Sequence, residues 1–132
     1  MAYDLHIERM GDRLDSEPIP IPLEEWCAAV AATSSVRLYP GEAYSVTTDT
    51  GEVISFRAHK GDSEVFFPDS GEWRSVFRWR EDSAVFVAEI RPGDITHPVW
   101  AAAVALASRL NAVIRGDEGE VYDLRTGEVV DA

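Results

Sequence analysis

Six segments with the length and composition of β-strands lie between residues 36 and 90, and the stretches between them are too short to hold helices. Gly, Pro, Asp and Ser, the residues that favour turns, separate the segments. Parallel neighbouring strands need a crossover of about a dozen residues or more, whereas antiparallel strands need only a tight turn. The spacing therefore predicts antiparallel hairpins in a meander. The six segments are Val36 to Tyr39, Glu42 to Thr48, Glu52 to Ala58, Glu64 to Phe67, Trp73 to Arg80 and Ala84 to Ile90.

The dipeptide Gly-Glu recurs between predicted strands. Glycine accepts the positive φ that a tight hairpin needs, and glutamate suits the solvated first position of the next strand. We therefore expect each pair to close a hairpin, including the one inside RGDEGEVYDL, residues 115–124. The five pairs are Gly41-Glu42, Gly51-Glu52, Gly71-Glu72, Gly119-Glu120 and Gly127-Glu128.

Two helices flank this strand-rich region. Pro22 suits a first helical position, and apolar residues at helical spacing extend the first helix to about Thr33. Thr96 is the expected cap of a second helix, Pro98 to Asn111, which is apolar on nearly all sides and should be deeply buried. This helix is expected to form the core with Phe86, which lies in a predicted strand, and with its own residues Trp100, Leu106 and Leu110.

Further strands are expected at both ends of the chain. Leu5 and Ile7 alternate with polar residues in the first strand, and Gly11 to Pro22 is expected to be a loop. Three short strands follow the second helix, over Val113 to Arg115, Glu120 to Leu124 and Glu128 to Val130. The order predicts one α+β domain over residues 1–132, with a mainly antiparallel sheet and two helices packed on one face.

Composition excludes several classes of protein. The formal net charge of −12 disfavours nucleic acid and anionic membranes, and it favours either basic partners or simple solubility. A single cysteine, Cys27, excludes an intrachain disulfide and a multi-cysteine zinc site. The first residues lack the pattern of a signal peptide, and no apolar run approaches the ~20 residues of a membrane span. We therefore expect a cytoplasmic protein.

Two acidic stretches are candidate ligand sites. In RGDEGEVYDL the carboxylates Asp117, Glu118 and Glu120 are too crowded for the spaced ligand series of a calcium loop. The turn opens a strand and not a helix, so it is no phosphate cradle, and a plain hairpin is the favoured interpretation. Asp4, His6 and Glu8 share one face of the first strand, but the outer two lie about 13 Å apart by strand rise, so a solvated or salt-paired face is expected.

The segment WRSVFRWR, residues 73–80, is expected to have two faces. Trp73, Phe77 and Trp79 would point to the core, and Arg74, Arg78 and Arg80 to the other side. The arginines would either pair with carboxylates of neighbouring strands or form a patch that binds an anion. Cys27 lies on the apolar face of the first helix and is expected to be a buried hydrophobe. The chain has no nucleophile elbow, no zinc-binding H-E-x-x-H and no P-loop, so we assign no catalytic, metal or cofactor residue.

Three motifs together resemble a group of small bacterial proteins without an established activity. They are YDLHIER in the first strand, PIPLEEW at the first helix and GDEGEVYDL after the second helix. The resemblance covers both ends of the chain and little of the middle. It implies a compact α+β bacterial cytosolic protein, and it transfers no role to any residue.

Three functions agree with these observations. The favoured one is a small acidic binding protein that contacts a basic protein partner, with a toxin-neutralising, immunity-type protein as one concrete form. The alternatives are an enzyme or ligand-binding protein with a pocket between sheet and helices, and a homo-oligomeric structural protein. The residues expected to contact the partner are Asp117, Glu118, Glu120, Asp123, Arg74, Arg78 and Arg80.

Overall fold

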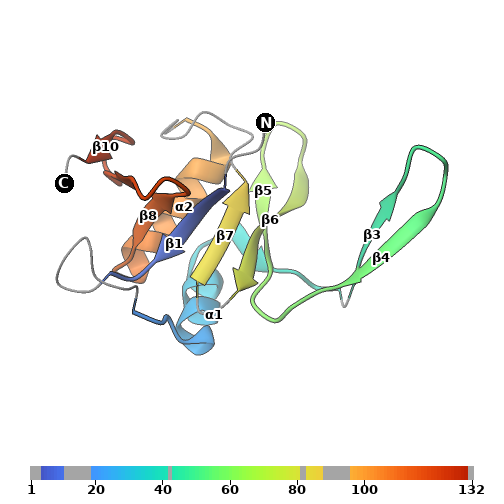
Figure 1. Ribbon diagram of the computed structural model, residues 1–132, viewed down its shortest axis with the longest axis horizontal. Helices are drawn as coiled ribbons and strands as arrows, with labels where there is room; N and C mark the ends of the chain where they lie inside the picture. Colours follow the sequence, from blue (N-terminus) through green and yellow to red (C-terminus); the bar gives the residue numbers. More distant parts are fainter. Residues whose placement is uncertain (1–3, 11–18, 42, 81–82, 88–95, 131–132) are drawn as a thin grey trace.

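The structure, a computed structural model, describes residues 4–10, 19–41, 43–80, 83–87 and 96–130. It confirms the α+β class: an antiparallel eight-stranded sheet is combined with two helices, and a separate two-stranded hairpin extends from this body (Figure 1). The elements are β1 Asp4–Glu8, α1 Leu23–Ala32, β2 Val36–Leu38, β3 Ala43–Thr47, β4 Val53–Arg57, β5 Ser63–Phe67, β6 Glu72–Arg80, β7 Ser83–Val87, α2 Pro98–Arg109, β8 Val113–Gly116, β9 Val121–Tyr122 and β10 Val129–Val130.

The first strand of the chain lies inside the main sheet. The strand order is β10-β9-β8-β1-β7-β6-β5-β2, so β1 separates the strands from the middle of the chain from the C-terminal strands β8 to β10. Leu5 and Ile7 of β1 are fully buried, whereas their neighbours along the strand are half-buried. The alternation predicted for this strand therefore gives it one core face, as a strand covered on one side requires.

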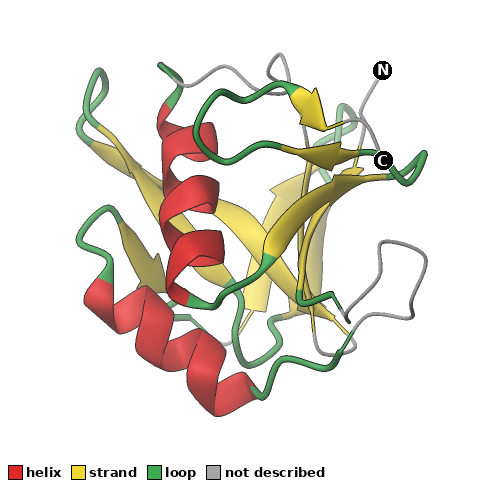
Figure 2. Cartoon of the chain, turned by 90° about the vertical axis from the view of Figure 1, so that its left-hand side faces the viewer, coloured by secondary structure: helices red, strands yellow, loops and turns green. Residues whose placement is uncertain are grey.

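Both helices lie on the same side of the sheet and enclose the core (Figure 2). Trp26 of α1 makes an edge contact with Phe77 of β6, with ring centroids 5.8 Å apart, and Phe77 in turn meets Phe86 of β7 at 5.3 Å. The four predicted core residues are confirmed, because each is at most 3% exposed: Phe86, Trp100, Leu106 and Leu110. One detail was wrong: the N-cap of α2 is His97 and not Thr96, since the Nδ1 atom of His97 accepts a hydrogen bond from the Val99 N–H.

The predicted strands are present, most with ends that differ by one or two residues, while 88–90 of the sixth segment lie outside the described residues. Four of the five Gly-Glu pairs have the expected positive φ at glycine, for example 87° at Gly119, where a tight turn joins β8 to β9. Gly41 is the exception. It has no positive φ and lies in the connection between β2 and β3, which is no hairpin turn.

A β-bulge in β6 overturns the expected division of faces in WRSVFRWR. The register pairs Phe77 with Ser63 but Ser75 with Glu64, so one residue of β6 is extra. Because side chains alternate along a strand, this slip moves Trp73 to the face opposite Phe77. Trp73 accordingly packs on Phe66, at 5.3 Å between ring centroids, and not in the core. Arg74 also changes face, in the opposite direction to Trp73, and lies 4.7 Å from the ring of Phe67.

The two-stranded hairpin is the outer half of one long, interrupted hairpin. In the inner half β2 pairs with β5 and ends with the pair Leu38–Ser63, and in the outer half β3 pairs with β4 from Ala43–Arg57 onward. Four residues, 39–42, connect the halves on the outgoing side and five, 58–62, on the return side. We call the outer half, residues 43–57, the arm. It projects well away from the main sheet (Figure 1).

Candidate binding surfaces: the arm and the pocket at its root

The arm carries an apolar face that nothing in the described chain covers. Val46 and Ile54 are cross-strand partners, and Phe56 lies two residues from Ile54, so all three share one face. These side chains are 51%, 41% and 53% exposed. Every residue of β4 is exposed, in contrast to the alternating burial of β1.

A hairpin of this kind has little stability of its own, because an isolated pair of strands is marginal in water. The tip is nevertheless well formed. Gly51 has a φ of 88° and donates its N–H to the Thr48 carbonyl oxygen at 2.9 Å, while the Thr48 hydroxyl accepts from the Glu52 N–H at 3.1 Å. The arm is therefore shaped by its turn and not by packing, and contact with another surface would be its main source of further stability.

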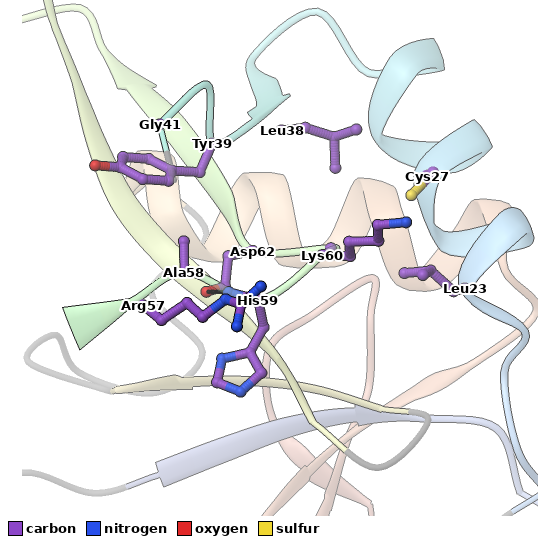
Figure 3. Close-up of a pocket in the computed structure, with 11 residues that line it drawn as sticks. Leu23, Cys27, Leu38, Tyr39, Gly41, Arg57, Ala58, His59, Lys60 and Asp62 are labelled. Atoms are coloured by element: carbon purple, nitrogen blue, oxygen red, sulfur yellow. Dashed lines mark hydrogen bonds between the residues drawn. The ribbon is translucent and has the colours of Figure 1, made fainter. Parts of the chain in front are cut away.

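A pocket of about 510 Å³ opens where the long hairpin is interrupted (Figure 3). Its walls come from three directions: α1, the end of β2 with the following connection, and the return connection from the arm. The apolar part of the wall includes Leu23 and Leu38. The return connection adds the cationic side chains of Arg57 and Lys60 and the imidazole of His59.

The buried carboxylate of Asp62 holds this return connection in place. Its side chain is fully buried and accepts hydrogen bonds from the backbone N–H groups of His59 (3.1 Å) and Trp79 (2.9 Å). It also forms an ion pair with Arg80 at 3.1 Å. The outgoing side is tied to the same residue, because the Tyr39 N–H donates to the Asp62 carbonyl oxygen at 2.8 Å. Asp62 therefore fixes both connections at the root of the arm, and it is a structural part of the pocket wall.

The three basic side chains of the pocket have no carboxylate partner among the described residues. Acidic residues outnumber Lys and Arg by 24 to 12 in this chain, and five arginines elsewhere form ion pairs with them: Arg9, Arg37, Arg74, Arg80 and Arg115. The side chains of Arg57, His59 and Lys60 form no ion pair with any residue that the structure describes. They therefore provide a local concentration of hydrogen-bond donors in an otherwise acidic protein.

Cys27 lies on the wall of the pocket opposite the return connection from the arm. It is half-buried, whereas the sequence predicted a buried side chain. Figure 3 shows the Lys60 side chain extending toward its sulfur. Burial raises the pKa of the Cys27 thiol, and the positive charge of Lys60 opposes this in part. The thiol is thus largely protonated at neutral pH and reacts only slowly there.

Comparisons with protein families, with curated proteins and with solved structures find no match. Function must therefore be inferred from the geometry of this chain. Two sets of residues are candidates for a binding site: those of the arm and its pocket, and those that the sequence predicts to contact a partner.

The acidic residues expected to contact a partner are largely engaged within the chain. RGDEGEVYDL forms the predicted hairpin between β8 and β9. Asp117 at its tip accepts from His6 at 3.0 Å and from the Asp4 N–H at 3.2 Å, and the His6 hydrogen bond, as the largest cause, lowers the Asp117 pKa. Tyr122 donates to Glu120 at 3.0 Å. The N–H groups of Arg125 and Thr126 donate to Asp123 and lower its pKa. Glu118 is exposed.

The arginines of β6 do not join these carboxylates in one site. In the sheet, β7 and β1 separate β6 from β8, and β9 lies one strand further away. Arg80 pairs with Asp62, Arg74 lies 3.4 Å from Glu72, and Arg78 is exposed. The structure thus divides the predicted contact residues between two distant parts of the sheet.

The charged face of β1 is salt-paired, as expected. His6 contacts Asp117, and Glu8 lies 3.7 Å from Arg115. Among the described residues no group of three His, Cys, Asp or Glu side chains is arranged to hold a metal ion. In the same residues no helix is long and apolar enough to cross a membrane.

Sequence reasoning missed the arm, the pocket and Asp62. One signal was available: three of the four residues in Arg57-Ala58-His59-Lys60 are basic types in a chain with few of them, and Lys60 is the only lysine. Nothing in the sequence separates the arm from the strands of the body, since its apolar residues have ordinary strand composition.

Proposed function

We propose that this chain is a binding protein that docks on a basic protein partner through the β3–β4 arm. The observation that carries the proposal is the uncovered apolar face formed by Val46, Ile54 and Phe56, which are 41–53% exposed on a projecting hairpin. Side chains of this kind are worth ~1.5–3 kcal/mol each when they pass from full exposure to full burial, and these can still gain about half of that on docking.

Charge selects the class of partner. The arm contains Asp49, Glu52 and Arg57, so nearly all of the net charge of −12 resides outside it. A partner of the arm approaches a protein of strongly negative net charge, which attracts a basic surface over a long range and repels a second copy of the same chain. A nuclease-like toxin has the required charge, which makes neutralisation of such a toxin one form of the proposal.

The arm also offers a way to bind a strand. Within the described chain β3 and β4 each have one strand neighbour, so each has an edge whose backbone N–H and C=O groups are not paired with a described strand. A partner strand could add to this edge while its side chains cover the apolar face. Backbone pairing would then supply affinity, and the apolar face would supply specificity.

The test compares two double variants of equal character. Ile54→Ser with Phe56→Ser removes two arm side chains that are 41% and 53% exposed. Val129→Ser with Val130→Ser, the control, removes two valines of β10 that are 52% and 41% exposed. A protein captured from host extract at low salt is produced separately and titrated against each chain by calorimetry. We expect a basic protein whose Kd rises at least ~10-fold with the arm variant, stays unchanged with the control and rises with salt.

Three outcomes would reject the proposal. In one, the arm variant binds the partner as tightly as the control does. In another, the captured partner is acidic and its affinity does not depend on salt. In the third, light scattering finds a dimer of the wild-type chain that the arm variant abolishes, which would make a second copy the occupant of the arm.

A further inference from the structure

We infer that the pocket at the root of the arm binds a small organic anion with an apolar tail. Its carboxylate or phosphate head is held by Arg57 and His59, and Lys60, which reaches across the pocket toward Cys27, adds positive charge to the site. The inference does not depend on the arm docking a partner. Its basis is the combination of a formed pocket, an apolar wall and three basic side chains that pair with no carboxylate in the described part of the chain.

The size and shape of the pocket fit a small molecule. A volume of about 510 Å³ falls within the ~300–1,000 Å³ typical of ligand sites. The site is also held by the rigid part of the fold. Gly61, in its wall, has its carbonyl oxygen hydrogen-bonded by the buried Trp26 indole N–H at 2.7 Å. Together with the hydrogen bonds to Asp62, this contact keeps the return connection in position before any ligand arrives.

The sign of the ligand follows from the pocket's charges. Asp62 is the only acidic side chain in the described wall, and its carboxylate is buried and occupied by Trp79, His59 and Arg80. The groups left for a ligand are therefore donors: a guanidinium, an ammonium and an imidazole. Arginine and lysine both bind carboxylates and phosphates, arginine through its planar fork and lysine as a point charge.

The apolar part of the ligand follows from the other wall. Leu23 and Cys27 lie on α1, and Leu38, which is 41% exposed, lies at the end of β2. In Figure 3 the Leu23, Leu38 and Cys27 side chains lie together on the side of the pocket opposite the Arg57 and His59 side chains. A head held at the basic side would therefore direct its tail toward α1, where burial of each methylene adds to binding.

The chain offers two chemical reporters for a binding test, because Lys60 is its only lysine and Cys27 its only cysteine. The probes are octanoate, octyl phosphate, acetate and octyltrimethylammonium. Acetylation of Lys60 by an N-hydroxysuccinimide ester and alkylation of Cys27 by iodoacetamide are followed by mass spectrometry, with the α-amine of the chain as the internal reference for the first reaction. Octanoate and octyl phosphate should slow both reactions at millimolar concentration, and the tighter of the two identifies the preferred head.

Variants separate the pocket from the overall charge of the protein. Lys60→Gln and Arg57→Gln each remove one positive charge from the pocket, and Arg109→Gln removes one from an exposed position in the last turn of α2. Binding is followed by tryptophan fluorescence, since Trp26 and Trp79 flank Gly61. An exposed ion pair contributes up to ~1 kcal/mol, so each pocket variant should weaken octanoate binding up to about five-fold, while the Arg109 variant binds as the wild type does.

Several results would overturn the inference. One is the absence of protection of both Lys60 and Cys27 by octanoate and octyl phosphate, a result that does not rely on any variant being folded. If acetate bound as tightly as octanoate, the apolar wall would not contribute to binding. If octyltrimethylammonium bound as tightly as octanoate, the basic groups would not contribute to binding. The same conclusion would follow if the Arg109 and Lys60 variants lost affinity equally.

Discussion

Replacing Asp62 by alanine should be among the most damaging single changes in this protein. The side chain is fully buried and accepts from the Trp79 N–H, the His59 N–H and Arg80. Without it the buried Trp79 N–H has no acceptor, which costs ~1–3 kcal/mol. Removing one partner of a buried ion pair costs ~3–5 kcal/mol, but Arg80 is 37% exposed and water would recover part of this. We therefore expect a loss of about 3 kcal/mol in the free energy of unfolding.

Urea unfolding followed by tryptophan fluorescence measures this loss. With a slope of about 2 kcal/mol per molar urea, the midpoint should fall by roughly 1.5 M. Asp62→Asn keeps one acceptor oxygen and should lose about half as much, because hydrogen bonds to charged groups are roughly twice as strong as neutral ones. Asp69→Ala, an exposed carboxylate in the turn between β5 and β6, should change stability by less than ~0.5 kcal/mol. If Asp62→Ala destabilises no more than Asp69→Ala, Asp62 does not hold the root of the arm.

Two further predictions use glycine and pH. Gly61→Ala should lower the melting temperature far more than Gly51→Ala. Both glycines have positive φ, but only at Gly61 would the new methyl lie 2.7 Å from Trp79. Equal effects in thermal unfolding would refute the role of this close approach. The hydrogen bond from His6 lowers the folded-state pKa of Asp117, so its contribution to stability is complete above the carboxyl's unfolded pKa and is lost as pH falls through the folded one. An NMR titration should find a higher Asp117 pKa in His6→Phe than in the wild type, and an unchanged pKa would refute the contact.

The strands and the core could be predicted because their signals are local. Turn residues mark the ends of the strands, and alternation in β1 and the apolar composition of α2 mark what is buried. The placement of β1 between β7 and β8 could not be predicted in the same way. It depends on which edges pair after the chain collapses, and no short segment encodes that choice. The same reason explains why the two predicted groups of contact residues are separated in the sheet.

The bulge in β6 shows how a local irregularity defeats a periodic argument. Alternation placed Trp73 with Phe77, but the extra residue between Phe77 and Ser75 reverses the faces beyond it. The new environment suits the side chains: Arg37 lies over the Trp73 ring at 4.5 Å and also pairs with Glu64 at 2.9 Å. The candidate pocket was out of reach for a related reason, since it exists only because the hairpin pairing stops at Leu38 and resumes at Ala43.

The extent of the helical layer explains why the arm remains uncovered. An eight-stranded sheet at ~4.8 Å per strand is about 34 Å wide, whereas helices of 10 and 12 residues are about 15 and 18 Å long. Both helices are committed to the main sheet, where Trp26, Trp100 and Leu106 are fully buried. Within the described chain no helix is left to cover Val46, Ile54 and Phe56, although strands of such composition usually pack against a second layer. We therefore expect the arm to gain cover from outside the described residues, and this expectation makes it the first surface to test for a partner.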